Sequence, residues 1–153
     1  MADVPLLKVT ELVKEFPLGG GLFARTRARV RAVDGVSFSI SRGETFALVG
    51  ESGCGKTTAG KGILQLIRPT AGSVSLNGEE LTTLRGSELR SKRTEMQMIF
   101  QDPFSSLDPR MPIGESIGEG LLVHKMADRQ ERHDEVVAVV SHVPHLAAAT
   151  LMQ

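Results

Sequence analysis

The order of apolar and polar residues predicts strands alternating with helices. Leu7–Val13 contains several β-branched residues and predicts a first strand. Val36–Ile40 alternates between apolar and polar residues, which is typical of a strand with one buried face. Thr45–Val49 is a short apolar run and predicts a strand buried on both faces, as in the centre of a parallel sheet. This pattern favours an α/β fold.

The chain after residue 55 continues the alternation. Its apolar periodicity, prolines and glycines predict four helices, over Lys56–Ile67, Ser87–Arg93, Ile113–Val123 and Asp128–Val140. They also predict two strands, over Ser73–Leu76 and Met96–Phe100, with a tight turn at Asn77-Gly78 after the first of them.

Arginine occupies every second position from Arg25 to Arg31. In an extended segment this spacing puts the guanidinium groups on one face. We interpret the run as a solvated edge or loop, because charge runs are usually exposed. The alternative is a contact with anionic lipid, a partner or nucleotide phosphate.

Composition narrows the class of protein. The 153 residues suit one domain, and 18 Lys and Arg against 18 Asp and Glu give no net charge, which argues against general nucleic-acid binding. No apolar run reaches the roughly 18 residues that a membrane helix needs, and the N-terminus lacks the pattern of a secretory signal. The one cysteine, Cys54, excludes an internal disulfide. These limits favour a cytosolic domain.

The segment from Gly50 to Thr57 reads G-x-x-x-x-G-K-[ST], the pattern of a phosphate-binding loop. Glycines allow the backbone to wind closely around a polyphosphate, and successive N–H groups form an anion nest. Lys56 supplies a full charge for the β- and γ-phosphates, and Thr57 offers a hydroxyl oxygen to Mg²⁺. The alternative is a glycine-rich turn that only caps a helix. We interpret Cys54 as a small residue that fits the loop, since no histidine lies beside it.

Three segments resemble a known family. Val33–Phe38 is similar to its "AVDGVSF" strand, Val49–Thr58 to its Walker A segment, and Ile99–Arg110 to its Q-loop. From about residue 6 to residue 123 the chain resembles the ATP-binding subunits of ABC transporters that import dipeptides, oligopeptides or nickel. The resemblance implies an incomplete P-loop NTPase fold with an antiparallel β part at the N-terminus.

The resemblance also implies roles for individual residues. Phe16 falls where the family stacks an aromatic ring on adenine, with a core or surface Phe as the alternative. Gln101 falls at the Q-loop glutamine, which reaches Mg²⁺ and the attacking water. Lys56 and Gln101 would act in catalysis, and Thr57 and Gln101 would bind Mg²⁺. The remaining contacts with ATP would come from Gly50, Glu51, Ser52, Gly53, Cys54, Gly55, Lys56, Thr57 and Thr58.

The family works with membrane permease subunits and a second ATP-binding subunit, at the cytoplasmic face of the inner membrane. The resemblance therefore implies the same partners and place here, and no nucleic acid. Phe104, Leu107 and Met111 would contact the permease, with packing against the following helices as the alternative.

The chain contains neither a Leu-Ser-Gly-Gly-Gln signature nor an apolar strand ending in Asp-Glu. We expect residues 1–123 to be the N-terminal part of an ABC ATP-binding domain and 124–153 to be an atypical helical tail. Without a positioned general base, hydrolysis should fall by about 10²–10⁴-fold or more. Open sheet edges should make the isolated chain marginally stable. The alternatives are a non-catalytic nucleotide-binding module and a non-functional truncation.

Overall fold

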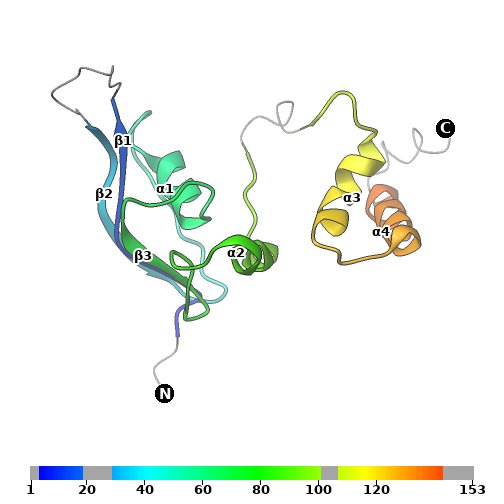
Figure 1. Ribbon diagram of the computed structural model, residues 1–153, viewed down its shortest axis with the longest axis horizontal. Helices are drawn as coiled ribbons and strands as arrows, with labels where there is room; N and C mark the ends of the chain where they lie inside the picture. The colour runs from blue at the N-terminus through cyan, green and yellow to red at the C-terminus, as the bar shows by residue number, and fades with distance from the viewer. Residues whose placement is uncertain (1–3, 19–28, 101–106, 143–153) are drawn as a thin grey trace. The chain divides into compact units, whose positions relative to one another are not determined.

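The computed structural model of the protein describes residues 4–18, 29–100 and 107–142. It divides into two compact units, Met1–Gln97 and Met98–Gln153, and each is described by itself. The first unit holds a sheet with a helix against it, and the second holds a pair of helices (Figure 1).

The sheet of the first unit has four antiparallel strands in the order β2-β1-β3-β4. They are β1 (Leu7–Pro17), β2 (Arg29–Ile40), β3 (Ala71–Leu76) and β4 (Glu79–Glu80). In the middle of the sheet, Val9 of β1 pairs with Phe38 of β2 on one side and with Val74 of β3 on the other. The antiparallel β part expected at the N-terminus is confirmed.

Helix α1 (Lys56–Ile63) packs on this sheet and closes the core of the first unit (Figure 1). Small residues allow the close approach: Ala59 is buried, and a Cβ on Gly62 would meet Leu12 Cδ2 at 3.8 Å. The buried apolar side chains of the core are Val9, Leu12, Val33, Ala59, Val74, Leu76 and Leu81.

Helix α1 ends at Ile63, four residues before the end expected from the sequence. The cause is Gln65, which takes the left-handed conformation at φ 55 although it is not glycine. The Leu66 amide then donates to Lys61 O at 2.9 Å, and the Gln65 amide to Gly62 O at 3.1 Å, which closes the helix as in a Schellman motif. The buried Gln65 side chain adds a 2.8 Å bond from Nε2 to Gly62 O.

The chain after β3 turns at Asn77-Gly78 as expected, with positive φ at both residues. Two short helical elements follow, α2 (Gly86–Lys92) and the 3₁₀ turn η1 (Arg93–Glu95).

Neither Thr45–Val49 nor Met96–Phe100 forms a strand, so these two predictions are wrong for the structure described. A strand needs a partner to take its backbone hydrogen bonds, and no strand among the described residues pairs with either segment, although the Phe46 ring stacks on Phe38 of β2 with 4.5 Å between the ring centroids. The most exposed apolar residues of the two segments are Val49, at 87%, and Ile99, at 90%.

The second unit contains α3 (Ile113–Val123) and α4 (Arg129–Ser141), which pack on each other (Figure 1). The contact passes over Gly118, where a Cβ would lie 3.1 Å from Arg132 and 3.2 Å from Val136. Helix α4 begins with a capping box, in which Asp128 Oδ1 accepts from the Glu131 amide and Glu131 Oε2 accepts from the Asp128 amide. None of the helices described is long and apolar enough to cross a membrane.

Candidate phosphate-binding site

The loop before α1 is organised around Lys56. The Lys56 ammonium donates to Gly50 O at 2.7 Å and to Glu51 O at 2.6 Å, and it lies 3.5 Å from Cys54 Sγ. The Cys54 amide donates back to Glu51 O at 3.3 Å. The lysine charge is thereby held inside the loop that the sequence motif marks as a phosphate cradle.

Helix α1 begins at Lys56, directly after Gly55 of this loop. Gly55 is the N-cap residue, has a left-handed φ of 98, and offers no side chain to cap the first N–H groups. The first turn holds no acidic residue that could neutralise the helix terminus. The positive end of the helix dipole, equivalent to roughly half a charge, therefore adds to the charge of Lys56. This combination favours a bound anion.

Three residues predicted to contact ATP are exposed in the loop. They are Glu51, Ser52 and Gly53. Thr57 is also exposed, and its hydroxyl makes no side-chain hydrogen bond to other described residues. A free hydroxyl oxygen at this position suits Mg²⁺, which prefers hard oxygen ligands. Thr58 lies half-buried in the first turn of the helix.

A cavity of about 300 Å³ separates the loop from strand β2. The loop contributes Cys54, Gly55 and Lys56 to its wall, and β2 contributes both charged and apolar side chains. The full lining is Arg31, Ala32, Val33, Asp34, Val36, Leu48, Val49, Cys54, Gly55, Lys56 and Ala59. Arg31 and Asp34 are distant from the loop in sequence, and only the position of β2 in the fold brings them to this cavity.

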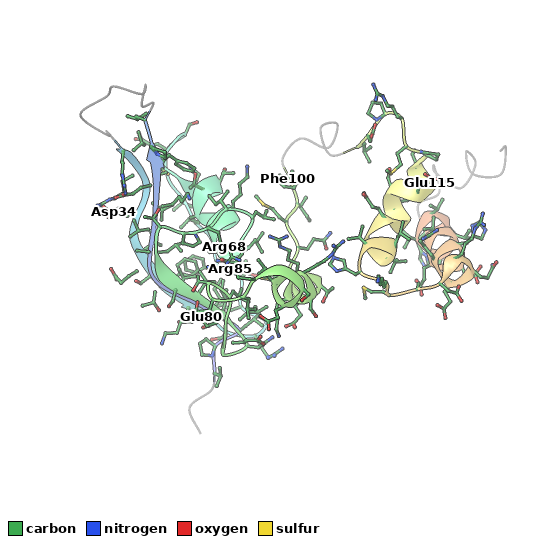
Figure 2. The ribbon with its side chains drawn as sticks, in the orientation of Figure 1. Asp34, Arg68, Glu80, Arg85, Phe100 and Glu115 are labelled. Atoms are coloured by element: carbon green, nitrogen blue, oxygen red, sulfur yellow. The ribbon has the colours of Figure 1, made fainter. Side chains whose placement is uncertain are left out.

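The charged residues of β2 are tied together by ion pairs. Glu15 of β1 accepts from Arg29 at 3.1 Å and from Arg31 at 3.0 Å, and Arg31 also donates to Asp34 at 2.9 Å (Figure 2 labels Asp34). The hydrogen bonds from Arg29 and then Arg31 hold the pKa of the Glu15 carboxyl below its usual value. Arg29 and Arg31 are exposed on the outer strand of the sheet, as the interpretation of a solvated edge expects; Arg25 and Arg27 lie outside the described residues.

Phe16 lies near the end of β1, opposite Val30 of β2. Phe16 is 41% exposed, and the Lys14 ammonium lies 5.1 Å from the centroid of its ring. Phe16 does not line the 300 Å³ cavity. Its stacking on adenine stays a prediction.

Several other predicted residues belong to the second unit. Gln101 and Phe104 lie outside the described residues. Leu107 is 53% exposed, and Met111 is half-buried just before α3. Their contacts with a permease also stay predictions.

The glycine-rich loop, its internal lysine and the following helix on an α/β core define a nucleotide-binding protein of the phosphate-loop class. Comparison with known families shows to which family within this class the chain belongs. Residues 33–151 match the family model described as ABC transporter, so the chain belongs to the ABC transporter family.

Curated relatives match most of the chain. The glutathione import ATP-binding protein GsiA of Pectobacterium atrosepticum is 46% identical over 139 residues, which cover 91% of this chain and 22% of GsiA. The oligopeptide transport ATP-binding protein AppF of Bacillus subtilis is 43% identical over 139 residues, covering 90% of this chain and 42% of AppF. The chain thus spans less than half of the length of these relatives.

Solved structures show the same fold. The ATP-binding cassette MJ0796, in a dimeric post-hydrolysis state bound to ADP and Pi, superposes with a TM-score of 0.71 at 23% identity, over 88% of this chain and 56% of that one. CbiO1 from Clostridium perfringens, part of the transporter complex cbiONQ, gives a TM-score of 0.65 at 21% identity, over 94% of this chain and 53% of that one. The expected ABC cassette fold, present in part, is confirmed.

Proposed function

We propose that this chain binds Mg-ATP through Gly50–Thr58. The observation that carries the proposal is the position of the Lys56 ammonium, within 2.7 Å of two loop carbonyl oxygens and at the uncapped start of α1. A polyphosphate would replace these neutral acceptors with charged oxygens, which adds the attraction between opposite charges to hydrogen bonds whose donor is already ionised.

In this proposal each residue of the site has a defined role. Lys56 binds the β- and γ-phosphates, the loop amides surround them, and the Thr57 hydroxyl binds Mg²⁺. Phe16 stacks on adenine and Gln101 reaches the metal and the attacking water, as the family resemblance implies. Mg²⁺ supplies charge neutralisation between the phosphates when it is bound.

The names of the relatives support a role in transport. GsiA is a glutathione import protein and AppF an oligopeptide transport protein. We therefore propose that the subunit to which this sequence corresponds energises import of peptide-class solutes. It would do so at the cytoplasmic face of the membrane, bound to permease subunits and to a second ATP-binding subunit. Within these 153 residues, which contain no signature motif, the proposal assigns nucleotide binding rather than a complete hydrolytic cycle.

Equilibrium binding of Mg-ATP to the unaltered chain and to Lys56→Ala tests this proposal. Loss of a charged hydrogen-bond donor should weaken binding by about tenfold or more. Lys61→Ala is the matched control, because Lys61 carries the same charge in the last turn of α1. Equal binding by the Lys56 and Lys61 variants would contradict the assignment of the site.

Partner binding separates this proposal from an interaction module that needs no nucleotide. A complete ATP-binding subunit can offer its signature motif to this chain but not the missing Asp-Glu strand, so we expect it to bind the chain in a manner that requires Mg-ATP and Lys56, with little added hydrolysis. A partner that binds the unaltered chain and Lys56→Ala equally well without nucleotide would favour the interaction module.

A further inference from the structure

Arginine side chains gather beyond the C-terminal end of α1, away from the phosphate loop. Arg68 Nη1 donates to Thr82 O at 3.2 Å, and Arg68 Nη2 donates to Leu84 O at 2.6 Å. Arg85 Nη1 donates to the same two oxygens, at 2.8 Å and 2.9 Å. Figure 2 labels Arg68 and Arg85, which come from the segments after α1 and before α2.

The shared acceptors fix how close the charges are. Arg68 Nη1 and Arg85 Nη1 both contact Thr82 O, so these two nitrogens are at most about 6 Å apart. A third guanidinium joins through Gln65: its side-chain oxygen accepts from Arg68 at 3.0 Å, and its backbone oxygen accepts from Arg93 at 2.9 Å. We call Arg68, Arg85 and Arg93 the arginine cluster.

The acceptors of the arginine cluster are all neutral. Carbonyl and amide oxygens take its hydrogen bonds, and no carboxylate among the described residues forms an ion pair with it. By contrast, Arg29, Arg31 and Lys92 each have a carboxylate partner. The C-terminal end of α1 offers only about half a negative charge. The charge of the cluster is therefore uncompensated within the described part of the chain.

Both burial and the neighbouring arginines disfavour the charged form of Arg68. Burial, and then the repulsion from Arg85 and Arg93, lower the pKa of the Arg68 guanidinium. Arg85 is exposed and donates only through Nη1, so its Nε and Nη2 groups make no hydrogen bond to the described residues. A planar guanidinium fork matches the oxygens of a phosphate group in a bidentate manner.

We propose that the arginine cluster is a second anion site, which binds a phosphate group independently of the phosphate loop. Gln65 lies nine residues after Lys56, and at about 1.5 Å per helical residue the two sites stand more than 10 Å apart along α1. No residue of Gly50–Thr58 donates to the cluster or accepts from it in the described structure. The ligand is an anionic phosphate group, either free as inorganic phosphate or as the phosphodiester of an anionic phospholipid headgroup.

Titration of inorganic phosphate into the Lys56→Ala chain, followed by amide NMR at constant ionic strength, tests the proposal. Saturable shifts are expected at Leu84–Gly86 and at Arg93. Arg85→Gln should weaken this binding roughly tenfold, since it removes one charged hydrogen-bond donor. The matched control is Arg42→Gln, which removes an exposed arginine that donates to Asn77 and lies outside the cluster. It should leave phosphate binding unchanged.

A parallel titration uses the chain with Lys56 intact, so the result does not depend on how the Lys56 variant folds. Shifts at the loop and at Leu84–Gly86 are then read separately. Shifts confined to the loop, or a phosphate affinity unchanged by Arg85→Gln, would overturn the proposal.

Vesicles distinguish the source of the phosphate group. Co-sedimentation with phosphatidylglycerol but not phosphatidylcholine vesicles, lost in Arg85→Gln and competed by inorganic phosphate, would assign the site to a headgroup. Phosphate binding without co-sedimentation would assign it to a free phosphate. Binding of neither probe at the cluster contradicts the site.

Discussion

Gly55 lies so close to the backbone of Ala32 that a Cβ on Gly55 would stand 2.0 Å from the Ala32 carbonyl oxygen. This contact joins the phosphate loop to strand β2 at the point where α1 begins. Backbone on both sides leaves no flexible side chain that could move aside. The second glycine of the motif is thus required by the packing of the loop on the sheet as well as by its left-handed φ of 98.

Gly55→Ala should therefore lower the free energy of unfolding by at least about 2 kcal/mol, from backbone strain and overpacking together. Gly60→Ala is the matched control in the same helix, because a Cβ there meets nothing within 4 Å. It should stabilise the chain by about 0.5–1 kcal/mol, as alanine does within helices. Chemical denaturation of both variants measures these changes in the free energy of unfolding. Equal effects of the two substitutions would show that the contact with Ala32 does not constrain the loop.

The ion pairs of Glu15 predict a dependence of stability on pH. Hydrogen bonds from Arg29 and Arg31 lower the Glu15 pKa in the folded chain. A lowered folded pKa stabilises the fold above the pKa of the unfolded chain, and this contribution is lost as the pH falls through the folded pKa. Glu15→Gln should therefore be less stable than the unaltered chain at neutral pH, with the difference disappearing in acid.

Denaturation from neutral to acidic pH measures that difference. The control is Glu119→Gln, because Glu119 is exposed and forms no ion pair with the described residues. It should show little difference at any pH. If Glu15→Gln remained equally less stable than the unaltered chain in acid, the residue would act through packing and not through its charge.

The exposed apolar segments predict self-association of the chain. Val49 and Ile99 are 87% and 90% exposed, and exposed apolar surface drives aggregation. Val49→Thr with Ile99→Thr should reduce light scattering on heating without lowering the melting temperature. Val74→Thr is the contrasting control: Val74 is fully buried, so the change should cost more than about 1 kcal/mol of stability. A sharp melt of the unaltered chain without scattering would contradict this prediction.

Features set by local sequence were predictable. The phosphate loop follows from glycine and lysine at fixed spacing, and Ile113–Val123 from its apolar periodicity and the preceding proline. The turn at Asn77-Gly78 follows from residues that tolerate positive φ. In each case the residues that cause the structure are neighbours in the chain.

Features set by distant residues were not predictable. The apolar run Thr45–Val49 resembles a strand, but a strand also needs a neighbour to share its hydrogen bonds. Gln65 ends α1 early because its buried side chain and carbonyl find partners at Gly62 and Arg93. Asp34 reaches the phosphate-loop cavity only because β2 folds beside the loop. Neither local propensity nor spacing contains this information.

The central claim is that Gly50–Thr58 binds the phosphates of a nucleotide. A titration of Mg-ATP into the unaltered chain, followed at each backbone amide by NMR, tests it most directly. We predict saturable shifts that are largest at Gly53, Gly55 and Thr57, whose amides belong to the loop and the first turn of α1. Saturable shifts elsewhere with none in this loop, or no saturable shift at all, would contradict the account.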